Sequence, residues 1–207
     1  MIIPPLRRLS LTAIVALSSA HAASLANFDF AAGSLSNSAS SISGITISTI
    51  SSGSSFNSFT SNSGWENAAQ ISGAASFFSS PTTHATAGNA LYFTITAASG
   101  YSFSLDSFSF LARSTATAPA DIGFKISSSF YDFSETYSNN STITPISNSS
   151  LGLSGLTSAT LSIQGWNASG SGALQLDNIF LTGSVIPEPS SATLVILGSV
   201  ALLRRRR

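Results

Sequence analysis

The chain has 207 residues and no net charge, because eight basic residues balance eight acidic ones. The balance is uneven along the chain: in residues 23–183, two cations stand against seven carboxylates, which gives this segment a net charge of −5. Two cations cannot neutralise a row of phosphates, which argues against nucleic-acid binding. The absence of cysteine excludes a disulfide framework, a thiolate metal site and a catalytic cysteine.

Residues 1–22 have the features of a secretory signal peptide. Arg7 and Arg8 supply its positive region, and a short apolar run follows them. Ala20 and Ala22 then fit the small-x-small cleavage pattern, which predicts export through the Sec translocon and a mature chain that starts at Ala23. The alternative is an uncleaved anchor, for which the apolar run is short.

The segment 23–183 is predicted to form one all-β domain. Apolar residues alternate with polar ones in several places bounded by Gly, Ser, Asn and Pro, which is typical of strands that bury one face. The alternation lies at Leu91, Phe93 and Ile95, at Ile122, Phe124 and Ile126, and at Ala159, Leu161 and Ile163, with further strands expected in 27–31, 44–50, 101–112, 142–146 and 173–182. We therefore expect an antiparallel β-sandwich of the jelly-roll type.

Two of these expected strands carry an aspartate where the alternation changes phase. Apolar alternation runs up to Leu105 before Asp106, and up to Leu176 before Asp177, and resumes one position later than expected. A shift of one residue would turn every later side chain to the other face of the sheet. A β-bulge at each aspartate restores the phase. The alternative is that these aspartates bind a structural calcium ion.

The strand from Leu174 to Gly183 resembles the closing strand of jelly-roll domains of the carbohydrate-binding-module type. The resemblance implies that the first and last strands are neighbours, which would bring Asp29 close to Asp177. Calcium takes about six to eight oxygen ligands, and two carboxylates with loop carbonyls supply part of such a set. Apart from structural calcium at these two aspartates, no cofactor is expected.

Catalytic residues are scarce, and we predict that the chain is not an enzyme. After removal of the signal peptide, His84 is the only histidine, and the sequence has no G-x-S-x-G nucleophile motif. A catalytic zinc ion normally needs about three protein ligands, often histidines. The carboxylates of Glu66, Asp132 and Glu135 leave a small secreted glycoside hydrolase open as an alternative.

Aromatic side chains suggest that the domain binds sugars. Saccharide sites combine an aromatic face with polar groups that bind the sugar hydroxyls. The main candidates are Trp65, which we expect in a loop, Tyr131, and Trp166, which precedes a Gly/Ser-rich turn; Tyr101 and Tyr137 are further candidates. For Trp166 the alternative is packing against the sandwich core.

Residues 184–207 form a tail with three parts. Pro187, Glu188 and Pro189 come first, an apolar run of twelve residues follows, and Arg204, Arg205, Arg206 and Arg207 end the tail. A helix of this run rises about 18 Å, which is short against a hydrocarbon core of about 30 Å. The arginines are expected to stay on the cytoplasmic side of the membrane, which puts the body outside the cytoplasm.

In this order, the three parts of the tail resemble PEP-CTERM sorting domains. The resemblance implies transient anchoring in the inner membrane by the C-terminal helix and removal of the tail by an exosortase-type transpeptidase. It also implies delivery to the cell surface, outer membrane or extracellular matrix of a Gram-negative bacterium that makes exopolysaccharide. An ordinary tail anchor is the alternative. For the body, we expect exopolysaccharide binding, with a passive matrix or coat protein as the alternative.

Overall fold

The computed structural model describes residues 22–52, 56–62, 65–72, 90–115, 119–128, 132–138, 141–168, 170 and 172–188. Within these ranges the chain forms thirteen strands and one short 3-10 turn, η1 (Ala31–Gly33). The predicted signal peptide up to His21 and the tail from Pro189 onward lie outside them. A search of the described residues finds no helix that is long and apolar enough to cross a membrane.

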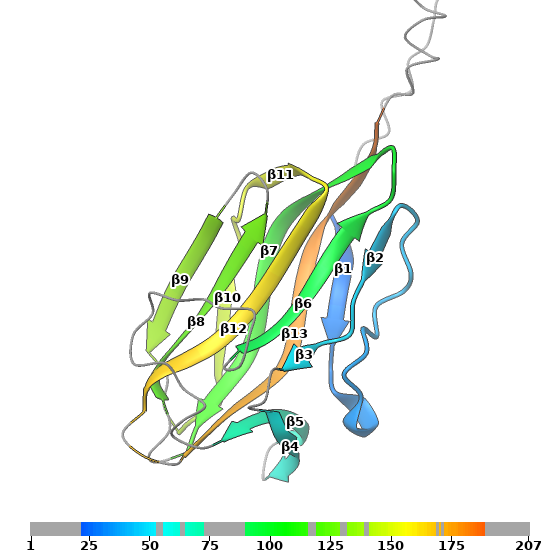
Figure 1. Ribbon diagram of the computed structural model, residues 1–207. Coiled ribbons are helices and arrows are strands. Elements are labelled where there is room, and N and C mark those ends of the chain that lie inside the picture. Colours follow the sequence, from blue (N-terminus) through cyan, green and yellow to red (C-terminus); the bar gives the residue numbers. More distant parts are fainter. Residues whose placement is uncertain are drawn as a thin grey trace, which may run out of the picture.

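The strands form two antiparallel sheets that lie face to face (Figure 1), which confirms the predicted all-β sandwich. The seven-stranded sheet contains β1 (Ala23–Phe28), β4 (Phe56–Asn62), β5 (Trp65–Ser72), β7 (Tyr101–Ser114), β10 (Thr144–Asn148), β11 (Leu153–Leu156) and β13 (Ala173–Pro187). The six-stranded sheet contains β2 (Ile45–Ile47), β3 (Ser51–Ser52), β6 (Ala90–Ala97), β8 (Pro119–Ser128), β9 (Asp132–Ser138) and β12 (Ser158–Ala168).

Both sheets are assembled from segments that are distant in the sequence. The long strand β13 pairs with β7 on one side and with β5 and β1 on the other, while β12 lies between β6 and β8. The chain passes between the sheets from β6 to β7, from β7 to β8 and from β12 to β13. Such crossings between two packed antiparallel sheets are typical of jelly-roll arrangements.

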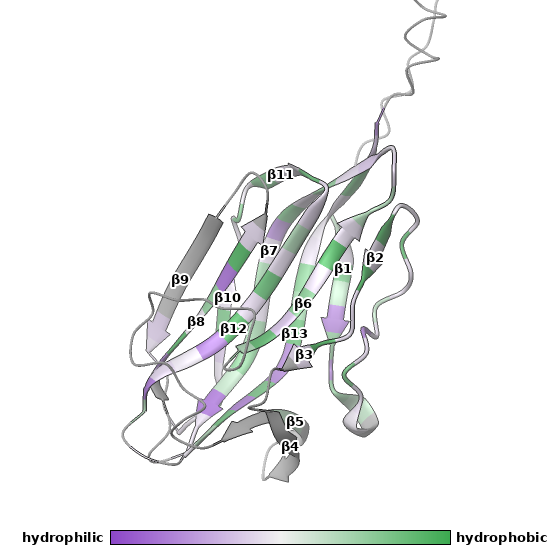
Figure 2. Ribbon diagram, in the orientation of Figure 1, coloured by the Kyte–Doolittle hydropathy of each residue, from purple (hydrophilic) through white to green (hydrophobic). Residues whose placement is uncertain are grey.

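Aromatic rings from both sheets meet in the core. The ring of Phe28 in β1 packs on Phe93 in β6 with 4.8 Å between centroids, and Phe108 in β7 packs on Phe124 in β8 at 4.9 Å. All nine residues of the three predicted alternations are buried, each at most 2% exposed. Figure 2 shows apolar and polar residues alternating along β6, β7 and β12. The predicted inward faces are therefore confirmed.

The predicted bulge at Asp177 is present. Asp177 is paired with Leu111 of β7, and Phe180 is paired with Ser109, so β13 carries one extra residue between the two pairs. Leu176 before the bulge and Ile179 after it are both buried, and the left-handed backbone of Asn178 (φ 48°) takes up the change of direction. The bulge keeps the apolar face of β13 toward the core.

The predicted bulge at Asp106 is present too, on the other strand of the same pair. Thr182 is paired with Ser107 and Gly183 with Leu105, which leaves Asp106 as the extra residue of β7. Its backbone carbonyl accepts a hydrogen bond of 3.0 Å from the N–H of Leu151, so the residue that leaves the ladder keeps a backbone partner.

Two details differ from the sequence-based expectations. Trp65 begins strand β5, opposite Asn62 of β4, and does not lie in a loop. Strand β13 continues to Pro187, beyond residue 182, where the predicted strand ends. In each case pairing with a neighbouring strand overrides a polar or proline-containing local sequence.

Candidate functional site

The outer face of the six-stranded sheet combines polar and aromatic side chains. Successive side chains of a strand point to opposite faces of the sheet. Because Leu161 and Ile163 of β12 point into the core, Ser162, Gln164 and Trp166 lie on the opposite, outer face. All three are buried, at 3%, 0% and 1% exposure respectively.

The register of β12 with its two neighbours defines rows of side chains across this face. Directly opposed residues on antiparallel strands have Cβ atoms roughly 4.5–5.5 Å apart. From one end to the other, the rows in the order β6, β12, β8 are Thr94, Thr160 and Ser127, then Tyr92, Ser162 and Lys125, then Ala90, Gln164 and Gly123. Beyond them Trp166 is opposite Asp121.

In the row at one end, two of the polar side chains are hydrogen-bonded to each other. The hydroxyls of Thr94 and Thr160 lie 3.0 Å apart and form a hydrogen bond with each other. At the other end, the side-chain N–H of Asn167 donates to a carboxylate oxygen of Asp121. The polar groups at both ends therefore have protein partners.

The side-chain amide of Gln164, which lies between these ends, has no hydrogen-bond partner. Neither its side-chain oxygen Oε1 nor its nitrogen Nε2 makes a hydrogen bond, although the residue is fully buried. Its row neighbours Ala90 and Gly123 are too small to reach the amide and carry no polar side-chain atom. A buried amide without partners costs about 1–3 kcal/mol. Such groups are rare in folded proteins and need a specific reason.

A second buried glutamine, Gln175, has the hydrogen-bond partner that Gln164 lacks. Gln175 in β13 is 1% exposed, and its Oε1 accepts a hydrogen bond from Nε of Arg113, its neighbour on β7. The two glutamines have the same burial but opposite hydrogen-bonding states. The amide of Gln164 is thus the one of this pair whose hydrogen-bonding groups are unused.

The aromatic candidates from the sequence end up in different places. Trp166 lies on the outer face, two residues from Gln164, and is too deeply buried to present an exposed ring. Tyr137 stacks on the core residue Phe124 with 6.2 Å between ring centroids. The ring of Tyr101 lies against Gly44. The side chain of Trp65 and the whole of Tyr131 lie outside what the structure describes.

Sequence reasoning missed Gln164 and Tyr92 as members of this face. Their signal was present, because both occupy the polar phase of strands whose apolar phase was recognised. The side chains of Glu66, Asp132 and Glu135, which left a hydrolase open, lie outside the described part of the chain, as does His84.

The first and last strands are neighbours, and they bring Asp29 close to Asp177, as expected. Phe28 of β1 is paired with Ile179 of β13, which puts the two aspartates at the same end of this strand pair. Burial raises the pKa of Asp177, the hydrogen bond from the N–H of Asn178 opposes this shift, and the negative charge of Asp29 raises the pKa further.

This pair supplies only part of a calcium site. One oxygen of Asp29 accepts from the N–H of Ala31 at 3.1 Å, and one oxygen of Asp177 accepts from the N–H of Asn178 at 2.7 Å. A search of the described residues finds no group of three or more His, Cys, Asp or Glu side chains that could hold a metal ion. Two carboxylates fall short of the roughly six to eight oxygens that calcium takes.

The calcium hypothesis predicts a melting temperature that is higher in calcium than in a chelator, because a cation between the two carboxylates removes their repulsion. Differential scanning calorimetry in calcium and in EDTA measures this difference, and Asp177→Asn should abolish it. Equal melting temperatures of the unsubstituted protein in both buffers would show that the pair binds no calcium.

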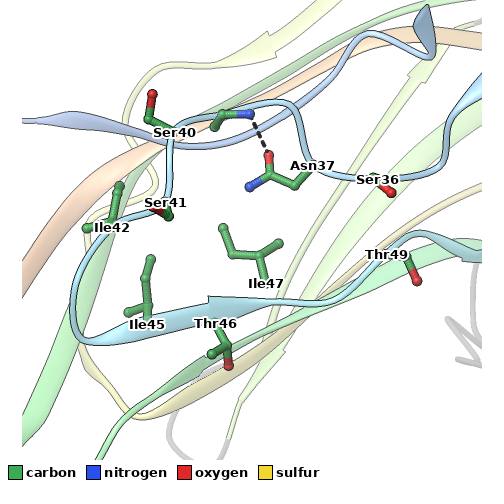
Figure 3. Close-up of a pocket in the computed structure, with 10 residues that line it drawn as sticks. Ser36, Asn37, Ser40, Ser41, Ile42, Ile45, Thr46, Ile47 and Thr49 are labelled. Atoms are coloured by element: carbon green, nitrogen blue, oxygen red, sulfur yellow. Dashed lines mark hydrogen bonds between the residues drawn. The ribbon is translucent and has the colours of Figure 1, made fainter. Parts of the chain in front are cut away.

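A groove of about 410 Å³ lies between β2 and the preceding loop (Figure 3). Ile42, Ile45 and Ile47 line it and pack partly against the core. Oδ1 of Asn37 accepts hydrogen bonds from the N–H groups of Asn27 at 2.8 Å and of Ala39 at 3.1 Å. The amide oxygen of Asn37 is thereby used to hold the loop against β1, which gives this groove a structural role.

A second groove, of about 360 Å³, lies on the outer face of the seven-stranded sheet. Phe180 of β13 is paired with Asn27 of β1 on one side and with Ser109 of β7 on the other, and Ser109 is in turn paired with Ser147 of β10. A half-buried ring thus lies in a row with an amide and two hydroxyls, which makes this groove the natural comparison for the Gln164 face.

The chain matches no protein-family model, and no curated protein is similar to it. Among solved structures, it is similar to a CBM4 module (14% identity, covering 62% of this chain and 77% of that one, TM-score 0.39). It is also similar to a family 11 carbohydrate-binding module from Clostridium thermocellum in complex with a β-1,3-1,4-mixed-linked tetrasaccharide (14% identity, covering 79% of this chain and 96% of that one, TM-score 0.37). A third similar structure is CBM28, a module specific for non-crystalline cellulose (12% identity, covering 59% of this chain and 78% of that one, TM-score 0.32). Likenesses at these identities and TM-scores assign neither a family nor a ligand to this chain.

Proposed function

We propose that the chain is an exported surface or matrix protein whose sandwich binds a polysaccharide on the outer face of the six-stranded sheet. The observation that carries the proposal is the buried side-chain amide of Gln164, which has no hydrogen-bond partner. Sugar hydroxyls both donate and accept hydrogen bonds, and a glutamine amide offers both an acceptor and a donor. The proposed ligand is therefore the chemical complement of this group.

The surroundings of Gln164 support a sugar ligand over a charged one. Tyr92, which is half-buried, lies on the same face and provides aromatic surface for the C–H groups of a pyranose ring. The buried ring of Trp166 joins it only when this face opens. Lys125 and Asp121 have opposite charges, so the face does not select strongly for an anion or a cation. Ala90 and Gly123 flank the amide with minimal side chains, so neither competes with a ligand for the hydrogen bonds of Gln164.

The burial of this face has a consequence for binding. Because Ser162, Gln164 and Trp166 are at most 3% exposed, a sugar reaches them only after a local rearrangement exposes this face. Binding is then coupled to a local opening, whose free energy reduces the apparent affinity. If this face stays closed in solution and no other face binds a sugar, the body is the passive matrix or coat protein that the sequence leaves as the alternative.

The two ends of the sequence support the export and sorting part of the proposal. The signal-peptide pattern ending at Ala22 and the terminal arginines Arg204 to Arg207 both put the body outside the cytoplasm. Pro187, Glu188 and Pro189 with the following apolar run are the features that an exosortase would recognise. The mass of the protein recovered from cell surface and matrix should lack both ends; a full-length protein in the cytosol would contradict export.

Gln164→Leu is predicted to raise stability and to remove binding. Leucine is close in size to glutamine, and it relieves the cost of an unpaired amide, so the free energy of unfolding should increase by about 1–3 kcal/mol. The melting temperature then rises by roughly 2–4 °C for each kcal/mol. Binding to exopolysaccharide purified from the producing bacterium, measured by pull-down, should weaken about tenfold or more, because the amide no longer bonds the sugar.

Two variants serve as controls. Gln175→Leu removes one hydrogen-bond acceptor of Arg113 and should lower the melting temperature. Phe180→Ala alters the groove on the other sheet and should leave the affinity unchanged. A lower melting temperature in Gln164→Leu would show that the amide has a partner in solution. Unchanged binding in Gln164→Leu with loss in Phe180→Ala would move the sugar site to the seven-stranded sheet.

A further inference from the structure

The last strand of the sandwich runs into the Pro-Glu-Pro element of the tail. Beyond Gly183, the pairing of β13 with β7 continues through Val185 opposite Phe103 and Ile186 opposite Ser102, and it ends with Pro187 opposite Tyr101. Val185 packs against the hydrophobic core. The first proline of the element is therefore a residue of the folded body.

Glu188 is bound to the body as well. Its backbone N–H donates a hydrogen bond of 2.8 Å to the carbonyl oxygen of Gly100, which lies in the turn between β6 and β7. The N–H of Tyr101 closes this turn by donating to the carbonyl of Ala98 at 3.1 Å, and Gly100 adopts a left-handed backbone with φ 80°. The pairing of Pro187 with Tyr101 and the hydrogen bond of the Glu188 N–H thus hold both residues of the Pro187–Glu188 peptide bond against the sandwich.

The turn that holds Glu188 is itself supported. The N–H of Ala98 donates to the carbonyl of Gly44 at 2.8 Å. The ring of Tyr101 lies so close to Gly44 that a Cβ atom at residue 44 would clash with the ring. Opening the end of β13 therefore means detaching Glu188 from a braced turn and lifting Val185 from the core.

We infer that the sandwich sets the boundary of processing: the tail is cut on the C-terminal side of Glu188, and Glu188 stays with the mature body. The inference rests on the proposed sorting function. A peptide bond is cleaved at an appreciable rate only when its segment opens from the fold. In the reaction, the C–N bond breaks, the carbonyl carbon bonds to water or to a primary amine of the acceptor, and the tail leaves with a new amino terminus that takes up the nucleophile's proton.

The native protein tests the position directly. Intact mass and C-terminal peptide sequencing of the protein from surface or matrix should find a last residue at or beyond Glu188. A mature C-terminus at Pro187 or earlier would overturn the inference while leaving sorting intact. A protein that keeps Arg204–Arg207 would instead contradict the sorting function, and the following experiment then still tests whether the sandwich protects the Pro187–Glu188 bond.

A post-proline endoprotease acting on the unprocessed full-length protein in detergent measures how well the Pro187–Glu188 bond is protected. Gly100→Val places a β-branched residue at φ 80° and should displace the carbonyl that holds Glu188, so cleavage at this bond should accelerate about tenfold. Gly152→Val is the matched control, because Gly152 has φ 63° and, like Gly100, no atom near a new Cβ. In Gly152→Val, the Pro187–Glu188 bond should be cleaved at the same rate as in the unsubstituted protein. Equal cleavage rates in all three proteins would overturn the inference.

Discussion

Phe124→Ala is expected to lower the free energy of unfolding by about 3–5 kcal/mol, the usual cost of removing a buried phenylalanine ring. The ring is fully buried in β8 and contacts Phe108 of the opposite sheet at 4.9 Å and Phe110 at 6.3 Å between centroids. It also stacks on Tyr137 of β9. Truncation therefore opens a cavity where the two sheets meet. Urea denaturation followed by near-ultraviolet circular dichroism measures the loss.

The matched control is Phe124→Leu. A leucine fills much of the space of the ring, so its cost should be lower, about 1–2 kcal/mol. The difference between the two variants isolates the cavity from the loss of aromatic contacts. If both variants cost the same small amount, the rings of β7 and β8 do not form the contact between the sheets.

The core could be predicted from the sequence because its signal is local. Period-two alternation at Phe93, Phe124 and Leu161 shows which side of each strand is apolar, whatever its partner. The two bulges were also readable, since a change of phase at Asp106 and Asp177 has one economical explanation in an antiparallel sheet. Pairing of distant segments, such as β1 with β13, leaves no such local mark and was expected only from a family resemblance.

The missed strands lacked this local signal. Strand β4 is mostly Ser, Asn and Thr around Phe56 and Phe59, and the described buried residues of β5 are the adjacent alanines Ala68 and Ala69. Adjacent small residues do not alternate, so the pairing of β4 with β5 is decided by tertiary contacts. The end of β13 was missed for another reason: Pro187 looks like a breaker, yet a proline is tolerated at a strand end, where no ladder N–H is required.

The candidate site could be predicted only in part. Its position on the polar phase of β6, β8 and β12 follows from the same alternation that defines the core. The importance of Gln164 does not follow from this alternation, because a glutamine on the polar side of a strand is ordinarily exposed and solvated. Its burial and its missing partners depend on the folded surroundings. The same dependence explains why Trp166 lies on this face, whereas its sequence suggested an exposed turn or a core-capping position.

Gly183→Ala is the second change with a large expected effect, although it adds a single methyl group. A Cβ at this position would overlap the backbone carbonyl oxygen of Ser104 on β7, and it would lie 2.6 Å from Cδ1 of the core residue Leu25. A carbonyl in a central strand cannot rotate away, so β13 has to separate from β7 beside the Asp106 bulge. Overpacking of this kind typically costs about 1–3 kcal/mol, and we expect the upper end because the main obstacle is backbone.

Gly100→Ala separates this clash from the general effect of replacing a glycine. A Cβ at Gly100 meets no atom within 4 Å, and its cost comes from the left-handed backbone alone. Urea denaturation should therefore find Gly183→Ala clearly the less stable of the two variants. If Gly183→Ala is as stable as Gly100→Ala, β13 and β7 do not approach as closely as the pairing of Gly183 with Leu105 requires. Gly183 also begins the last paired segment of β13 and β7, which ends with Pro187 opposite Tyr101. Separation of the two strands at Gly183 should therefore weaken the attachment of Glu188 to the sandwich as well.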